Sequence, residues 1–148
     1  MAQTDATSYG YALPKAQPGQ LYDARGNTVM SFAAEEALTF GQPVMRGTDP
    51  EKQVLLSDAT AFVGVAMFTH AKEQDRDTGV ASYAIADTVS VMTDGALYVE
   101  AGADTIVAGE TAYVTAAGAY TNVVGSNLEI GTFLTGGDTG DAVVLELA

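Results

Sequence analysis

Alternation of apolar and polar side chains, interrupted by glycine turns, is the feature of this sequence that most restricts its fold. It is clearest over residues 87–115, which read DTVSVMTDGALYVEAGADTIVAGETAYVT. A period of two residues is typical of a half-buried β-strand, and Asp94-Gly95 between two such runs is a strong hairpin signal. The chain therefore predicts strands joined by tight turns.

The form of the turn at Asp94-Gly95 follows from the faces of the two flanking strands. A two-residue turn would scatter apolar and polar side chains over both faces. A three-residue loop of Thr93, Asp94 and Gly95, with Gly95 in the left-handed conformation, instead gathers apolar side chains on one face. These side chains are Val89, Val91, Leu97 and Val99. We expect this bulged hairpin, and a second hairpin across residues 116–118.

Shorter elements are expected elsewhere. Residues 22–32 alternate loosely across an Arg-Gly-Asn turn and predict a first hairpin, whereas AAEEAL at residues 33–38 favours a helical turn or two. Gly64 marks a bulge or a close backbone approach within the most apolar strand. The segment HAKEQDRDTG at residues 70–79 predicts the longest loop. Further strands are expected over residues 44–46, 53–56, 61–69, 80–85, 128–135 and 142–147.

The spacing of these strands predicts the fold class. Sixteen glycines punctuate the chain, and no regular alternation of strands with helices is visible. This pattern is typical of an all-β protein, here a small β-barrel or sandwich of short antiparallel strands with an extended N-terminal arm. A chain of 148 residues is long enough for one domain without disulfides, and it has no cysteine. We expect a single β domain over residues 21–148.

Residues 1–20 differ from the rest because they are polar and hold only a short apolar cluster. That cluster is Tyr9, Tyr11 and Leu13, followed by Pro14. One interpretation is a disordered tail; the other is an arm that orders on a neighbouring subunit and uses these side chains as contacts. Under the second interpretation Tyr9, Tyr11, Leu13 and Pro14 are the candidate contact residues.

The charge distribution restricts the partners. The formal net charge is −13, only 17% of residues are charged, and all six basic residues lie between Lys15 and Arg76. The acidic remainder would repel phosphate, so we expect neither direct nucleic-acid binding nor an anionic membrane surface. A weakly charged surface suits extensive contact with other proteins, although a soluble monomer also fits. With no transmembrane-length run and no signal-peptide pattern, we expect synthesis in a cytoplasm.

Sequences that suggest catalysis are present but incomplete. Asp-Thr-Gly occurs at residues 77–79 and 138–140, as in an aspartic protease, where paired carboxylates activate water. Both copies lie in polar turn sequences rather than beneath apolar strands, and the chain is short for two lobes. The lone His70 cannot form a metal cluster, and no nucleophile elbow or phosphate loop is present.

Metal sites are equally incomplete. Asp75, Asp77 and Gly79 match the opening of a calcium loop, but Ala86 stands where the bidentate glutamate belongs. The turn containing Asp138 and Asp141 has the wrong glycine-aspartate order for a β-roll repeat. We therefore expect no catalytic, cofactor-binding or metal-binding residues, no cofactor, and a role in binding or building rather than enzymatic turnover.

Four phrases together point to a known family. They are PGQLYDA from Pro18, FGQPVMRGTD from Phe40, FVGVAMF from Phe62 and the long run from Tyr83 to Val114. In their order and spacing, they resemble the capsid cement, or head decoration, proteins of tailed bacteriophages. The resemblance covers most of the chain from Pro18 onward, and nothing in residues 1–17 takes part in it.

The resemblance implies a non-enzymatic virion protein: a small β-barrel-like homotrimer on the outer surface of the capsid, bridging neighbouring major capsid subunits. It carries over no catalytic motif. Two other classes stay open: a carbohydrate-binding or adhesin-like β-sandwich, which usually displays clustered aromatics whereas this chain has no tryptophan, and a small hydrolase.

Overall fold

A computed structural model describes residues 16–69, 82–103 and 105–147. The described residues form eleven β-strands and no helix, which confirms the predicted all-β class. The strands are β1 (Thr28–Ala34), β2 (Leu38–Thr39), β3 (Pro43–Arg46), β4 (Gln53–Leu56), β5 (Gly64–Ala66), β6 (Ser82–Tyr83), β7 (Thr88–Glu100), β8 (Thr111–Val114), β9 (Tyr120–Thr121), β10 (Leu128–Phe133) and β11 (Ala142–Leu147).

Five strands close into a barrel in the order β1-β4-β3-β5-β7, and β7 returns to pair with β1. Four of the five pairings are antiparallel, while β1 and β4 run parallel through Ala33 and Ala34. The barrel is therefore mixed rather than purely antiparallel. Closure pairs most strand edges, which would otherwise be free to recruit other chains.

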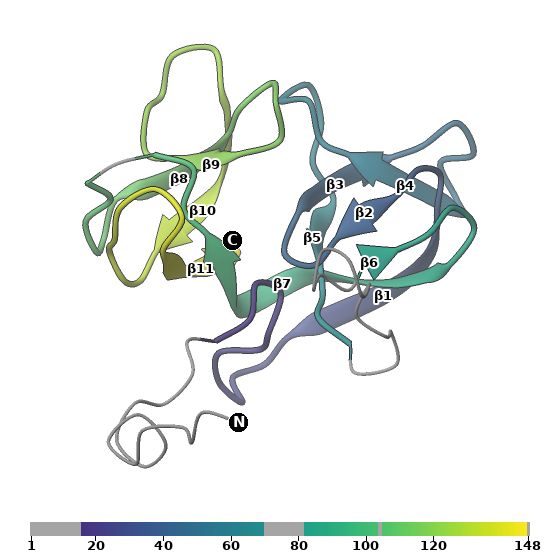
Figure 1. The fold of residues 1–148 in the computed structure, drawn as a ribbon, viewed down its shortest axis with the longest axis horizontal. Coiled ribbons are helices and arrows are strands. Elements are labelled where there is room, and N and C mark those ends of the chain that lie inside the picture. The colour runs from purple at the N-terminus through teal and green to yellow at the C-terminus, as the bar shows by residue number, and fades with distance from the viewer. Residues whose placement is uncertain (1–15, 70–81, 104, 148) are drawn as a thin grey trace, which may run out of the picture.

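Strand β7 belongs to two parts of the molecule (Figure 1). Its first half, from Thr88, pairs with β1 and β5 of the barrel, and its second half, up to Glu100, pairs with β11. From β11 the sheet continues through β10 and β8 to β9. We call β8–β11 together with the second half of β7 the second lobe. A single strand thus joins the barrel to the second lobe.

The continuity of β7 shows that the hairpin predicted at Asp94-Gly95 is wrong. The strand runs for 13 residues through this dipeptide. Its pairing with β1 shifts between Val29, opposite Met92, and Thr28, opposite Asp94, so that Thr93 is an extra residue on β7. Gly95 has a φ of 129°. The Asp-Gly signal therefore marks a bulge within a long strand, not a reversal of the chain.

Two further predictions are wrong for the same kind of reason. Residues 22–32 do not form a hairpin, because Leu21 bridges Leu97 while β1 pairs with the first half of β7. The helical turn expected over residues 33–38 is also absent. Ala33 and Ala34 end β1, and the two following glutamates accept backbone hydrogen bonds from Thr48 and Leu56. Tertiary pairing overrides the helix propensity of this segment.

Most of the remaining strand predictions hold, although the strand expected over residues 61–69 is shortened to β5. The turn at residues 47–52 joins β3 to β4, the turn at residues 115–119 joins β8 to β9, and β10 pairs with β11. Gly64 does mark a close approach, because a Cβ there would lie 2.2 Å from the carbonyl oxygen of Met92. The strand expected over residues 80–85 is only β6, and the loop expected over residues 70–79 lies outside the described residues.

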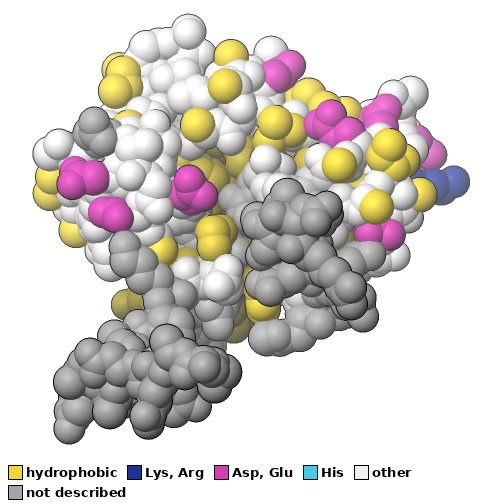
Figure 2. Space-filling model, viewed as in Figure 1, with side chains coloured by type: hydrophobic (Ala, Val, Ile, Leu, Met, Phe, Trp, Pro, Cys, Tyr) yellow, Lys and Arg dark blue, Asp and Glu magenta, His cyan; other side chains and the backbone are white. Residues whose placement is uncertain are grey.

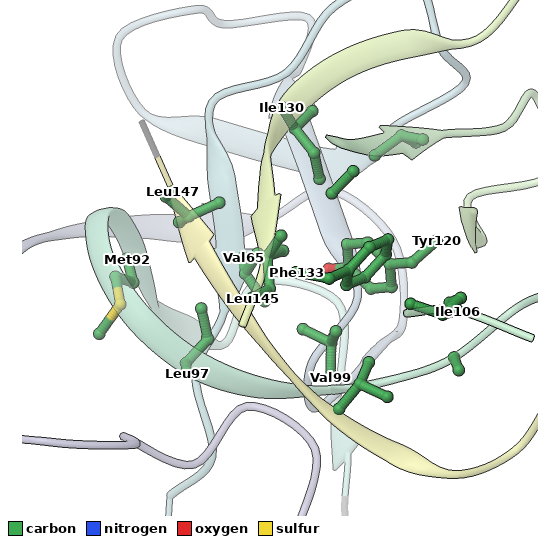
Figure 3. Packing of buried hydrophobic residues seen from close by; sticks show 14 residues of the cluster. Val65, Met92, Leu97, Val99, Ile106, Tyr120, Ile130, Phe133, Leu145 and Leu147 are labelled. Carbon is green, nitrogen blue, oxygen red and sulfur yellow. The ribbon is translucent and has the colours of Figure 1, made fainter. Parts of the chain in front are cut away.

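Two apolar cores fill the molecule. One lies within the barrel and includes Phe32, Val89 and Val91. The other lies between the strands of the second lobe and also takes in Val65 and Met92 from the barrel strands (Figure 3). The four side chains that we expected on one face of a hairpin are all buried, but they divide between these two cores. Shared burial through β5 and β7 holds the two parts together.

Candidate functional site

The candidate contact residues of the N-terminal segment lie outside the described residues. These are Tyr9, Tyr11, Leu13 and Pro14. The described residues begin at Ala16, and from there the chain runs beside β7. The Gly19 N–H donates to the Tyr98 carbonyl over 2.6 Å, and the Tyr98 N–H donates to the Gln20 carbonyl over 2.9 Å. Gly19 is tightly enclosed, because a Cβ there would lie within 3 Å of three backbone atoms.

The described Asp-Thr-Gly sequence forms a surface turn between β10 and β11. Asp138 accepts the Thr105 N–H over 3.2 Å, and Asp141 accepts the Asp138 N–H over 2.9 Å. These carboxylates therefore cap a turn and satisfy its backbone donors. The other Asp-Thr-Gly sequence, Asp75 and His70 lie outside the described residues. Within the described ranges, no three His, Cys, Asp or Glu side chains cluster as a metal site would require.

Exposed apolar side chains provide the more informative surface. One group lies beside β7 and comprises Leu21, Tyr22, Val29 and Met30, each 41–44% exposed. A second group is carried by the loops of the second lobe and comprises Val107, Val123 and Val124, which are 54–63% exposed. Ile85 stands apart at 70%. Figure 2 shows hydrophobic side chains interspersed with acidic ones over both parts of the molecule.

The second group, which we call the lobe tip, is held in place by hydrogen bonds of Glu110 and Asn127. Glu110 accepts the Val107 N–H and the Asn122 amide, each over 2.8 Å. These two hydrogen bonds, the Val107 bond first, lower the pKa of Glu110 below its ordinary value. The Asn127 side chain donates to the Val123 carbonyl over 3.0 Å. The three valines therefore stand on two loops that are fastened to each other.

The basic side chains of the described residues are already engaged by neighbours. Arg25 pairs with Asp23 and with Glu146 of β11, and its hydrogen bond lowers the pKa of Asp23. Arg46 lies 5.6 Å from the centre of the Phe32 ring and donates to the Pro50 carbonyl. Only carboxylates contribute charge to the second lobe, because no basic residue follows Arg76. Its surface suits a neutral or basic partner.

A cleft lies between the barrel and the second lobe. Its volume is about 210 Å³, and residues 39–43 face residues 100–102 and 118–120 across it. The buried Tyr120 hydroxyl donates to the Gly41 carbonyl over 2.7 Å and so ties β9 to the barrel. Glu100 is the one carboxylate among the residues that line the cleft. A lone carboxylate in a cleft of this kind provides no partner for acid-base chemistry.

Comparison with known families identifies the protein class. A family model described as structural cement protein (E217 gp24/Pam3 gp6) matches residues 5–148. The chain belongs to this family. It is a structural, non-enzymatic phage capsid cement protein and resides at the capsid surface of the virion. The resemblance to phage capsid cement proteins, which we inferred from four sequence phrases, is thereby confirmed.

Solved structures share the fold of this cement protein. One described as the capsid of Myoviridae phage XM1 matches with a TM-score of 0.70 and 17% identity, covering 99% of this chain and 97% of that chain. Another, the head fiber gp8.5 N base of bacteriophage phi29, matches with a TM-score of 0.51 and 13% identity, covering 83% and 95%. Among curated proteins, no match was found.

Sequence reasoning missed the two exposed apolar groups of the cement protein. The lobe tip had a usable signal, because Val123 and Val124 stand next to each other in TNVVGSN, a sequence of turn residues in which apolar side chains are unexpected. The group beside β7 had no such signal, because Val29 and Met30 lie in an ordinary strand pattern. Among the described residues no helix is present that could cross a membrane.

Proposed function

We propose that this cement protein acts as a homotrimer on the outside of a tailed-phage head, where each copy bridges neighbouring major capsid subunits. Family membership over residues 5–148 carries this proposal. Two details of the proposal, the homotrimer and the bridging of capsid subunits, rest on the weakly charged surface and on the two exposed apolar groups. Apolar groups at separate places on one copy allow contact with more than one neighbour.

The lobe tip supports a contact with the shell. Its valines are exposed while their backbones are fixed by Glu110 and Asn127, so binding would order few additional groups. The surrounding carboxylates favour a partner surface with basic side chains around an apolar site.

The N-terminal segment supports a second contact. That the chain divides into an arm over residues 1–20 and a β domain over residues 21–148 stays a prediction. Tyr9, Tyr11 and Leu13 alternate with small residues, so an extended chain would present all three on one face, and Pro14 follows them. We infer that these four residues contact the major capsid protein or a neighbouring copy.

The physical effect of such contacts is stabilisation by linkage. A protein that binds the assembled lattice and not its separated subunits shifts the equilibrium toward the lattice in proportion to its occupancy. A trimer joins three sets of contacts, so each later contact forms at a high effective concentration. Individually weak contacts can therefore resist the internal pressure of packaged DNA.

Undecorated expanded heads test the proposal. Purified protein should co-sediment with the heads and raise the temperature at which they release DNA, and light scattering of free protein should give three times the 15.2 kDa of one chain. No binding to heads would refute the cementing role. A monomeric mass with binding intact would refute only the trimer.

A deletion tests the arm. Removing residues 2–15 leaves Gly19 and its bonds to β7 in place, so we expect an unchanged melting temperature of the free protein but weaker binding to heads. A full-length variant with Tyr9, Tyr11 and Leu13 replaced by serine should lose binding to a similar degree. Unchanged binding of both proteins would refute the proposed contact residues.

A further inference from the structure

The outer edge of β1 is incompletely paired. Along one edge, β1 pairs with β7 from Thr28 to Ala33, but along the other it pairs with β4 only at Ala33 and Ala34. Among the described residues, no strand pairs with the outer edge over residues 28–32. We call this stretch the β1 edge.

Alternation along the strand identifies the backbone groups that face outward. The Ala34 N–H donates toward β7, to Asp87, whereas the Ala33 N–H donates the other way, to Lys52 beside β4. Successive residues of a strand direct their N–H and C=O groups to opposite edges. Val29 and Ser31 therefore direct theirs outward, as Ala33 does, while Met30 and Phe32 bond to β7.

The β1 edge has few of the features that normally prevent pairing with another chain. Residues 28–31 are all exposed, Val29 at 44% and Met30 at 42%. The strand sequence TVMSFAA contains no charged residue and no proline, although the chain as a whole carries a net charge of −13. Natural proteins usually protect such edges with lysine, proline or a covering loop.

We propose that the β1 edge pairs with the β1 edge of a second copy, antiparallel, about a twofold axis at Met30. Val29 of each copy then lies opposite Ser31 of the other. Their outward N–H and C=O groups form four hydrogen bonds without any change in the bonds to β7. Pairing ends at Phe32 because β4 occupies the next position.

The second copy is the occupant that these observations favour. The arrangement of outward groups around Met30 is self-complementary, as an isologous contact requires. Two strongly acidic molecules can also approach along this stretch, because its strand is uncharged. In the trimer proposed above, on which this step rests, a twofold contact of this kind links copies that belong to different trimers.

A single cysteine tests the pairing, since the chain has no native cysteine. At the centre of the pair, the two copies of residue 30 form a non-hydrogen-bonded pair with Cα atoms about 4.5 Å apart, within the range that a disulfide spans. The full-length Met30→Cys variant should form a disulfide-linked dimer under mild oxidation, followed on a non-reducing gel.

Ile85→Cys and Val124→Cys are the matched controls, because these side chains are more exposed than Met30, at 70% and 63%. We expect Met30→Cys to cross-link at least about tenfold faster than either control, because pairing holds its sulfurs together. A rate no higher than that of the controls would overturn the proposal. Circular dichroism of each variant verifies that it is folded.

Two second-site changes identify the contact as strand pairing between the same edges. Ser31→Pro removes an outward N–H and no bond to β7, so adding it to Met30→Cys should reduce cross-linking to the control rate. Replacing Tyr9, Tyr11 and Leu13 by serine in the Met30→Cys protein should leave the rate unchanged. Persistent cross-linking in the first case, or its loss in the second, would overturn the proposed pairing.

Discussion

Replacing Tyr120 by phenylalanine tests the bond that ties the second lobe to the barrel. The Tyr120 hydroxyl is buried and donates to the Gly41 carbonyl over 2.7 Å. A hydrogen bond of this kind contributes about 1 kcal/mol net, and more when the remaining partner stays without water. Here both residues line the cleft of about 210 Å³, so water can reach Gly41 after the change. We therefore expect a loss of about 1 kcal/mol, or roughly 2–4 °C in melting temperature.

The pH dependence of this loss gives a stricter test. Burial raises the pKa of Tyr120 well above its ordinary value of 10.0. In the pH range above 10 the unfolded chain gives up this proton while the folded protein keeps it, so folding stability falls by roughly 1.4 kcal/mol for each further pH unit. Phenylalanine has no proton to lose. The wild-type advantage should therefore be complete at pH 8 and disappear by about pH 11.

Urea denaturation at both pH values measures the difference, with Tyr113→Phe as the control. Tyr113 is half-buried in the same lobe, and the described residues contain no hydrogen-bond partner for its hydroxyl. Tyr83 also has a raised pKa, but it is present in every variant and cancels in the comparison. The reasoning is refuted if Tyr120→Phe is as stable as Tyr113→Phe at pH 8, or if the difference is unchanged at pH 11.

Three further predictions address the second lobe. Gly131→Ala would place a Cβ 2.0 Å from the Glu146 carbonyl oxygen, so we expect a loss of about 3 kcal/mol or more, whereas Gly26→Ala, with nothing within 4 Å, should leave the urea midpoint unchanged. The pKa of Glu110 is lowered, so its carboxylate accepts the Val107 N–H fully above pH 4.5, and this hydrogen bond is lost as the pH falls through the lowered pKa. Amide hydrogen exchange of Val107 measures the loss, and protection that stays constant at acid pH would contradict it. Replacing Val123 and Val124 by serine should leave the melting temperature unchanged but weaken binding to heads. Ile85→Ser is the control, and an equal loss of binding in that variant would argue against the lobe tip as the shell contact.

Strand positions could be predicted from the sequence where the signal and the partner lie close together. The β8–β9 and β10–β11 hairpins follow from glycine turns between alternating runs, and the all-β class follows from their number. Asp94-Gly95 carries the same signal, yet β7 continues through it as one strand. Each half of β7 finds partners farther away, β1 and β5 for the first half and β11 for the second. A positive φ at Gly95 serves a bulge as well as it serves a turn.

The segment after β1 shows why local propensity failed. AAEEAL favours a helix on its own, but Ala34 is buried in the barrel core and the Glu36 carboxylate accepts the Leu56 N–H over 2.8 Å. Both interactions depend on residues about twenty positions away, which a local pattern does not contain.

The candidate interaction surfaces depend even more strongly on long-range pairing. Whether Val29 and Met30 are buried or exposed is decided by how far β4 extends along β1, and that pairing stops after Ala33 and Ala34. An additional five paired residues on β4 would cover the β1 edge without changing the sequence of β1. The β1 edge is therefore exposed because of how the barrel closes and not because of the sequence of β1. A substitution at Met30 or Ser31 can then test the contact while the bonds between β1 and β7 are kept.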